Sequence, residues 1–515
     1  DALRQTLAEL GRLQLLANDA TGAVASYEEA ARLHAAAGAL VDQRRATANL
    51  GLAQYVAGDK EASYAAYQQA LALSRQTQDR SAEGVVLARL GEIDSDLGRD
   101  AQALDLLQQA IVVLAETHQA SEEASAHTLV GNIHYLASRN DDAIAAYQRA
   151  VALHRSLDDA SDVAIDLGNL GNTYMEAEQY EQALATFVEA QAAARTGKNV
   201  GTEAIATVGQ ARALVKLDRT AEAVPLFEQG IAIYRSTGNA DGLRGALSKS
   251  GAARRAVGDQ AGAVRDLKEA IELHRQARDR AGESRDLSVL GQAYGALNED
   301  ALALQAYEEA VVSDVDLGDK EGEAWDRRKL ATAYQNIGRG RDAVAEFQKA
   351  LALRRELGQP DKVLDVLDAL GQAQETIGDY KASLATHQEA LQLARQAKSR
   401  IDESSAITGI GKAQLGLGQA AQALQSFEQA LVIDVELANR NAQRIDYTTL
   451  GDVHRSLKQW PQALEAYQKA LDLARELNNS DAEAGTHTRI GNLAFDQEQY
   501  AESIAAYDRA LAVHE

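Results

Sequence analysis

The sequence predicts an all-α solenoid, a fold in which short helical units stack one after another. Three observations support this prediction. A unit with a period of 40 recurs along the whole 515-residue chain, apolar residues recur at spacings of three and four in each half of the unit, and turn residues separate the halves. Because such a unit buries its apolar face only against its neighbours, we expect 13 helix–turn–helix repeats with one continuous core.

A small residue marks the same position in every repeat. It is glycine in eleven repeats and alanine in two: Gly11, Gly51, Gly91, Gly131, Gly171, Ala211, Gly251, Gly291, Ala331, Gly371, Gly411, Gly451 and Gly491. Successive markers are always separated by the same interval, so the pattern contains no insertion or deletion. The sequence therefore predicts a single solenoid domain over residues 1–515, with a marker at 11, 51, 91 and onward at this interval to 491.

Repeat 5 illustrates the packing expected within a unit. Small residues occupy the marker Gly171 and two later positions of the repeat, Ala183 and Ala190, whereas bulky Phe187 stands between these two alanines. A larger side chain at a small position would overpack the contact at a cost of roughly 1–3 kcal/mol. We expect the small residues to allow close helix contact and Phe187 to fill the space between one hairpin and the next.

Turn residues are expected to end each helix. Gly58-Asp59 falls between the two halves of a repeat, and Gly38 and Gly238 follow second halves, where glycine readily adopts the left-handed conformation that ends a helix. A coiled coil is the structural alternative. It is excluded because 40 is not a multiple of seven and the turn residues would interrupt a long helix. The repeat thus predicts 26 helices.

Charge and composition limit the class of partner. The chain has 52 Lys and Arg against 76 Asp and Glu, a formal net charge of −24, and no cysteine. This acidity disfavours nucleic acid and anionic membranes, which need a basic face, and favours a protein or peptide partner of mixed charge. Without cysteine, disulfides and thiolate metal sites are excluded. No apolar run approaches the roughly 18 residues of a membrane span, and no signal region opens the chain, so we expect a cytoplasmic protein without membrane insertion.

Both ends of the sequence suggest a larger context. The chain begins at Asp1 without an initiator methionine, and it closes at Glu515 within a second helix, with no polar capping helix after it. Solenoid ends require a solvating cap. Three interpretations stay open: an excised piece of a longer protein, a neighbouring domain, or end-to-end self-association that builds a ring or a filament.

The pattern of the unit resembles the tetratricopeptide repeat. The residues that carry the resemblance are Leu170, Gly171, Tyr174, Ala183, Phe187 and Ala190, and their spacing recurs through the chain. The period is 40 rather than 34 and the closing proline is missing, which resembles the long-helix subclass in Pins/LGN-type adaptors and kinesin light chains. The alanine-rich, cysteine-free composition is equally similar to bacterial versions attached to signalling ATPases or caspase-like proteases. The resemblance implies a right-handed superhelix whose first helices line a concave, ligand-binding groove.

Motifs of catalysis and metal binding are missing from the sequence. Neither His-Glu-x-x-His nor Gly-x-x-x-x-Gly-Lys-Ser/Thr occurs. Four histidines share one position of the repeat but lie three repeats or more apart, so they are not expected to meet: His34, His154, His274 and His514. His134 and His454 occupy the tyrosine position of the repeat and are expected in the core. We therefore predict no catalytic residue, no metal site, no cofactor and no enzyme activity.

Charged residues on the face expected to line the groove change sign along the chain. Positive residues gather in repeats 7 to 9 beside one tryptophan, and acidic residues follow in repeat 10; the candidates are Lys249, Arg255, Arg285, Trp325, Arg328, Lys329, Asp365, Asp368 and Glu375. Tryptophan and arginine are typical of binding hot spots. The pattern indicates a groove for a peptide with acidic and then basic segments. Pairing of these charges with one another across neighbouring helices is an equally open interpretation.

Asparagines form a second group of candidates on the same face. Asn132 and Asn172 follow their markers, and Asn169 lies two residues before one. An asparagine amide both donates to and accepts from a peptide backbone, as an extended ligand requires. The family resemblance implies such a role, whereas hydrogen bonding to the adjacent repeat is the structural alternative.

The function predicted from these observations is a non-enzymatic scaffold that binds an extended peptide or a partner protein in its groove. Two alternatives stay open: the sensor arm of a larger signalling ATPase or caspase-like protease, and a self-assembling ring or filament. The carboxylate clamp of some chaperone cofactors is disfavoured, because no repeat has lysine at the required position, three residues before the marker.

Overall fold

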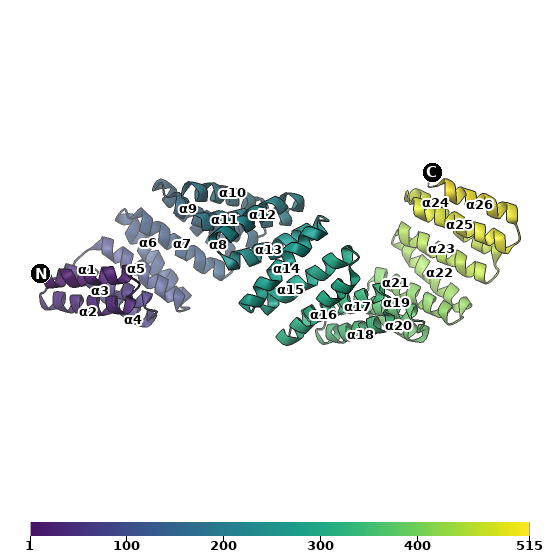
Figure 1. The fold of residues 1–515 in the computed structure, drawn as a ribbon, viewed down its shortest axis with the longest axis horizontal. Coiled ribbons are helices and arrows are strands. Elements are labelled where there is room, and N and C mark those ends of the chain that lie inside the picture. Colours follow the sequence, from purple (N-terminus) through teal and green to yellow (C-terminus); the bar gives the residue numbers. More distant parts are fainter. Residues whose placement is uncertain (1, 514–515) are drawn as a thin grey trace. The chain divides into compact units, whose positions relative to one another are not determined.

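A computed structural model describes residues 2–513, and their regular structure consists of 26 α-helices without a strand (Figure 1). This confirms the all-α prediction. The first helices of the repeats are α1 Ala2–Leu16, α3 Leu40–Val56, α5 Arg80–Asp96, α7 Ala120–Leu136, α9 Ala160–Glu176, α11 Val200–Lys216, α13 Ala240–Ala256, α15 Arg280–Ala296, α17 Lys320–Asn336, α19 Pro360–Thr376, α21 Arg400–Gly416, α23 Arg440–Ser456 and α25 Ser480–Asp496.

The second helices begin about halfway through each repeat, so the two halves of a repeat are nearly equal in length. They are α2 Ala20–Ala36, α4 Lys60–Gln76, α6 Asp100–Glu116, α8 Asn140–Ser156, α10 Tyr180–Thr196, α12 Thr220–Thr237, α14 Gln260–Ala277, α16 Asp300–Leu317, α18 Gly340–Glu356, α20 Tyr380–Ala397, α22 Ala420–Glu436, α24 Trp460–Glu476 and α26 Tyr500–Ala512. Helices that follow one another in the chain pack side by side as antiparallel hairpins (Figure 1).

The chain divides into two compact units, Asp1–Ala270 and Ile271–Glu515, with the division inside α14. We call them unit 1 and unit 2. Unit 1 contains α1 to α13, and unit 2 contains α15 to α26. The single solenoid over residues 1–515 stays a prediction.

A residue in the left-handed region stands between successive helices, at positions 18, 38, 58 and onward at the same interval to 498. Gly38 (φ 64°) and Gly58 (φ 87°) confirm the predicted turns, but fifteen of these positions in the described chain hold another residue, such as Asn18. Around Gly58, its N–H donates to the carbonyl of Tyr55 (3.0 Å) and the next N–H, of Asp59, donates to the carbonyl of Gln54 (2.9 Å). This Schellman pair of bonds satisfies carbonyls at the helix end, so the turn geometry is kept where glycine is absent.

The marker glycines lie against the bulky residue of the same hairpin. A Cβ added at Gly171 would stand 2.7 Å from the Phe187 ring, and one at Gly209, in the next repeat, would stand 2.6 Å from the same ring. Phe187, Ala183 and Ala190 are fully buried. The Phe187 ring therefore fills the space between two successive hairpins, as expected. The glycines that face the ring leave room for it.

The histidines occupy the positions expected of core residues. His34, His154 and His274 are buried and lie in separate repeats, whereas His514 lies outside the described residues. His134 and His454 are half-buried. His154 Nδ1 is 2.7 Å from Asp166 Oδ2 in the following helix, so this histidine links α8 to α9.

Candidate functional site

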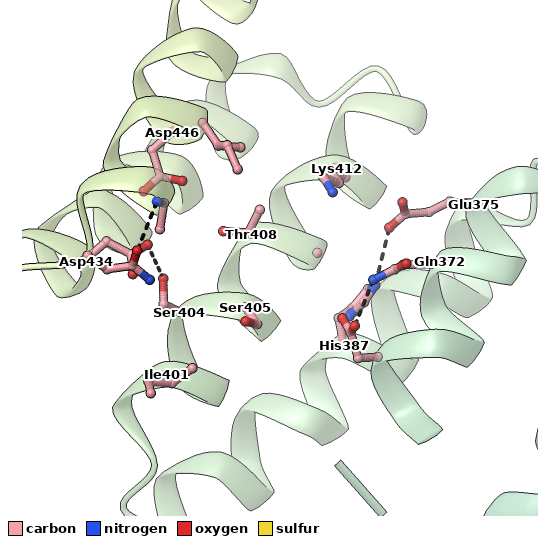
Figure 2. A pocket seen from close by; sticks show the side chains of 15 residues that line it. Gln372, Glu375, His387, Ile401, Ser404, Ser405, Thr408, Lys412, Asp434 and Asp446 are labelled. Atoms are coloured by element: carbon pink, nitrogen blue, oxygen red, sulfur yellow. Dashed lines mark hydrogen bonds and ion pairs between the residues drawn. The ribbon is translucent and has the colours of Figure 1, made fainter. Parts of the chain in front are cut away.

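Two adjoining cavities lie on α17 and α19 to α23 of unit 2. The first, of about 230 Å³, is lined by residues of α19 to α23, and Figure 2 shows its side chains. The second, of about 150 Å³, is lined by residues of α17 and α19 to α21. Asp368, His387 and Ser405 line both. We call the combined surface the unit 2 groove.

The apolar pattern of α19 decides which of its side chains face the groove. Val366, Leu367 and Leu370 are buried against neighbouring helices. The opposite face of the same helix, at spacings of three and four, carries Asp365, Asp368, Gln372 and Glu375, which line one or other of the two cavities. The three acidic residues predicted in repeat 10 are thus brought to one surface.

A buried pair of carboxyl groups forms one side of the first cavity. Asp434 of α22 and Asp446 of α23 face each other beside Ser404, which donates a hydrogen bond of 2.7 Å to Asp434 Oδ2 (Figure 2). Asp446 is 3% exposed. Burial and the neighbouring Asp434 raise the pKa of Asp446 to about 8. Its Oδ2 atom is buried and accepts no hydrogen bond from any described residue.

His387 and Glu375 form the other side of the first cavity, across Ser405 and Thr408 of α21 (Figure 2). His387 occupies the position of the bulky core residue and is almost completely buried. Its Nε2 lies 3.3 Å from Glu375 Oε1, but neither ring nitrogen makes a hydrogen bond within the described part of the chain. Glu375 also accepts a hydrogen bond of 3.1 Å from Ser383. The cavity therefore has acidic groups on both sides.

Arg328 of α17 lines the second cavity together with Asp365 and Asp368. Although acidic residues line the same cavity, Arg328 forms no ion pair with any residue from 2 to 513, and its Nε is buried without a partner. Its neighbour Arg327 differs, because it pairs with Glu323 and Glu346, both at 2.7 Å. Arg328 thus presents an unneutralised charge to the groove.

Trp325 and Lys329 contact each other on α17. Lys329 Nζ lies 4.8 Å from the centre of the Trp325 ring, which is a cation–π distance, and Trp325 is 45% exposed. The cation–π contact occupies one face of the ring that the sequence suggested as an anchor. Neither residue lines the two cavities of the unit 2 groove.

The other predicted cations are not gathered at this groove. Arg285 of α15 is exposed and donates from Nε to the carbonyl of Ala281 at 3.2 Å. Lys249 and Arg255 belong to α13 of unit 1. The structure therefore places Arg328, Asp365, Asp368 and Glu375 around one surface and leaves the remaining charged candidates elsewhere.

Internal pairing of charges, the alternative interpretation, holds for a neighbouring cation. Arg254 of α13 is buried, and its Nε donates to Asp266 Oδ2 at 2.9 Å. It also pairs with Glu228 and Asp259. Arg254 is therefore fully engaged inside unit 1, in contrast to Arg328.

Two of the three candidate asparagines accept hydrogen bonds within the protein. Asn132 Oδ1 accepts a hydrogen bond of 2.7 Å from Tyr147 Oη, and Asn172 Oδ1 accepts one of 3.1 Å from Arg212, one repeat further along. Asn169 is half-buried, and its side chain makes no hydrogen bond to another described residue. The Asn172 bond reaches the next repeat and supports the structural alternative, whereas the Asn132 bond stays within its own hairpin.

His387, Asp434 and Asp446 are not among the site residues predicted from the sequence. A usable signal was present, because an aspartate pair with the same spacing in sequence occurs at Asp314 and Asp326. At this spacing, the first aspartate lies on the second helix of one repeat and the second aspartate lies on the first helix of the following repeat. Only the burial of the pair, which appears in the structure, shows that the two carboxyl groups meet.

Two further properties concern the described chain as a whole. Within residues 2–513, no three His, Asp or Glu side chains come together in an arrangement that would hold a metal ion. None of the helices in this range combines the length and the apolar character needed to cross a bilayer.

Comparison with known proteins identifies the repeat. The family model described as "Tetratricopeptide repeat" matches residues 122–196, 167–236, 323–396, 402–476 and 441–515. No curated protein matches the chain.

Similar solved structures include BtubC (BKLC) from P. vanneervenii, with 16% identity, a TM-score of 0.36, and coverage of 42% of this chain and 89% of that chain. A Signal Transduction ATPase with Numerous Domains from Pyrococcus horikoshii, which has a tetratricopeptide repeat sensor, gives 15% identity and a TM-score of 0.46 over 65% of this chain and 52% of its own. The TPR-like repeats of a putative kinesin light chain from Podosopora anserina have 17% identity and a TM-score of 0.35. The match covers 37% of this chain and 94% of that chain.

The five matched segments together cover more than half of the chain, and they coincide with the regularly repeated helix–turn–helix hairpins. Marker glycines packed against the bulky residue of the following helix are present in the repeats of both units. The chain belongs to the tetratricopeptide repeat family.

Proposed function

We propose that the protein is a non-enzymatic interaction scaffold and that the unit 2 groove binds an extended, mixed-charge peptide segment of a partner protein. One observation carries this proposal. Two adjoining cavities bring Arg328, which has no ion-pair partner among the described residues, to the same surface as Asp365, Asp368 and Glu375. Charges that the fold leaves unneutralised at a concave surface are available to a ligand.

The chemistry of the groove sets the order of charges in the ligand. An acidic side chain of the peptide is expected beside Arg328, and basic side chains are expected along the face of α19 that carries Asp368 and Glu375. A peptide whose charges are separated into two blocks therefore fits better than one whose charges alternate.

The test uses labelled peptides of equal length and composition in three arrangements: an acidic block before a basic block, the reverse order, and strict alternation. Fluorescence anisotropy with the full chain is expected to show tighter binding of one block peptide than of the alternating peptide. Arg328→Glu combined with Lys329→Glu is expected to weaken that binding roughly tenfold or more and to remove the preference.

A matched control is Arg341→Glu combined with Lys381→Glu, which changes the net charge equally at exposed positions of α18 and α20 outside the groove. The control is expected to bind as the wild type does, with both variants folded by circular dichroism. Equal binding of all three peptides, or equal loss in both variants, would show that the groove is not the site. The roles as a sensor arm and as a self-assembling protein stay predictions.

A further inference from the structure

A separate pocket of about 290 Å³ lies in unit 1 among α9, α11, α12 and α13. Its floor is apolar: Met175 of α9, Val215 of α11 and Phe227 of α12, with Ala253 of α13. Phe227 is 1% exposed, so the floor is part of the hydrophobic core. We call this cavity the unit 1 pocket.

The pocket is open because small residues line α13. Ala252 and Ala256 stand at its wall, one turn apart, where larger side chains would fill the space. On the same helix, a Cβ added at Gly245 would meet only the amino group of Lys249, at 3.8 Å. Apart from Lys249, which itself lines the pocket, this face of α13 carries only small residues.

Three cations surround the apolar floor: Arg212, Lys216 and Lys249. Arg212 is oriented by its hydrogen bond of 3.1 Å to Asn172 Oδ1, and Lys216 Nζ lies 6.0 Å from the centre of the Tyr180 ring. Both contacts are with neutral groups, and neither Arg212 nor Lys216 forms an ion pair within the described chain. In a protein of net charge −24, this is a local concentration of positive charge.

Exposed apolar residues extend the surface beyond the pocket. Ile205 precedes Val208, Arg212 and Val215 on α11 at helical spacings, so all four share one face of the helix. Ile205 is 46% exposed, and Ile165, at the equivalent position of α9, is 41% exposed. Apolar surface and positive charge are therefore combined on the first helices of repeats 5 to 7.

We propose that the unit 1 pocket is a docking site for an acidic peptide segment of a partner protein, with one bulky apolar side chain inserted between α11 and α13. The carboxylates on either side of that side chain lie against Arg212, Lys216 and Lys249. Charge complementarity selects this occupant, because three cations at the rim repel a basic segment and leave a neutral one without ionic contacts.

The size of the pocket determines how much of the ligand enters it. Its volume of about 290 Å³ is just below the range of about 300–1,000 Å³ typical of small-molecule sites. One side chain such as leucine or phenylalanine therefore occupies it, and the rest of the segment runs over the surface. The site does not depend on the unit 2 groove, which combines Arg328 with several acidic residues.

The experiment uses labelled heptapeptides with acidic residues on both sides of a central residue that is glycine, alanine, leucine or phenylalanine. A second set has lysine in place of the acidic residues. In fluorescence anisotropy with the full chain, acidic peptides with a central leucine or phenylalanine are expected to bind roughly tenfold more tightly than the acidic peptide with a central glycine. No such preference is expected in the lysine set.

Two variants locate the binding. Ala252→Phe fills the pocket and is expected to remove the preference for the apolar central residue. Lys216→Glu combined with Lys249→Glu is expected to weaken all acidic peptides. The matched control, Arg149→Glu combined with Lys268→Glu, changes exposed cations outside the pocket and is expected to bind as the wild type does.

Three results would overturn the proposal: equal affinity for glycine and leucine peptides, equal affinity for acidic and lysine sets, or unchanged binding by both pocket variants. Tighter binding of decanoate than of any peptide would overturn it too, because the pocket would then be a site for an anionic lipid. The Arg328→Glu, Lys329→Glu variant is expected to bind these heptapeptides normally, which separates this result from the test of the unit 2 groove.

Discussion

At the scale of single residues, one contact recurs in the repeats of both units: a marker glycine against the bulky side chain of the following helix. Gly131 faces Tyr147, Gly171 faces Phe187, and a Cβ at either glycine would come within 2.7 Å of the ring. The close approach requires the absence of a side chain. This explains why the marker is glycine in most repeats, although glycine lowers the intrinsic stability of a helix.

The marker contact predicts opposite effects for two glycines of α9. Gly171→Ala is expected to destabilise the protein by roughly 1–3 kcal/mol, because the new Cβ overlaps the buried Phe187 ring. Gly168→Ala, one turn earlier, is expected to stabilise it by up to about 1 kcal/mol, because its Cβ would meet only Thr202, at 4.0 Å. Denaturant unfolding measures both, and equal effects of the two substitutions would contradict the role of the contact.

At the scale of helices, polar pairs join each of two second helices to the first helix of the next repeat. His154 of α8 pairs with Asp166 of α9, whereas Asp434 of α22 faces Asp446 of α23. The two pairs occupy equivalent positions of the repeat, so the same junction carries a histidine–aspartate contact in one repeat and two acids in another. The acid pair is stable only when at least one carboxyl group is protonated.

This junction predicts that the stability of unit 2 falls as the pH rises. The folded-state pKa of Asp446 is about 8, well above the value of about 4 in an unfolded chain. Between these two pKa values the folded state therefore binds more protons than the unfolded state. The resulting contribution to the free energy of unfolding is complete below about pH 4 and is lost as the pH rises through about 8. Burial also raises the pKa of Asp326 to about 8, so this residue likewise makes unit 2 less stable as the pH rises.

Asp446→Asn is expected to weaken this pH dependence and to stabilise the folded state at high pH by roughly 1–3 kcal/mol. Urea unfolding of the full chain, followed from acidic to alkaline pH, measures the change. Asp365→Asn, at an exposed carboxylate of α19, is the control and is expected to keep the wild-type dependence. A variant whose stability follows the wild type at every pH would rule out a buried acid pair.

At the scale of the molecule, the hairpins within each unit contact their neighbours in the chain. The cluster around Phe187 draws on residues from α8 to α11, and the cluster around Phe427 draws on residues from α21 to α24. Such an array is stabilised by the sum of its local interfaces. A defect in one repeat is therefore felt most strongly by adjacent repeats.

Phe187→Ala is expected to cost about 3–5 kcal/mol locally. Hydrogen exchange followed by mass spectrometry on the full chain is expected to show faster exchange in α9 to α11 and unchanged exchange in α21 to α26. Val188→Ala, at an exposed position of the same helix, is the control and is expected to leave exchange unchanged throughout. A uniform increase along the chain would indicate that all repeats unfold together.

The helices, the glycine turns and the residues of the repeated contact are predictable from the sequence, because they follow from a short pattern with a fixed period. The structure shows that the turn also forms where Asn18 stands in place of glycine, with the same pair of backbone bonds. Tertiary structure alone decided which charges are neutralised: Arg254 is paired inside the protein and Arg328 is not. It also decided that Asp434 meets Asp446 and that Arg212 is held by Asn172 of the preceding repeat. Side chains so far apart in sequence meet only when repeats stack, and their burial, which sets their charge, arises from that stacking.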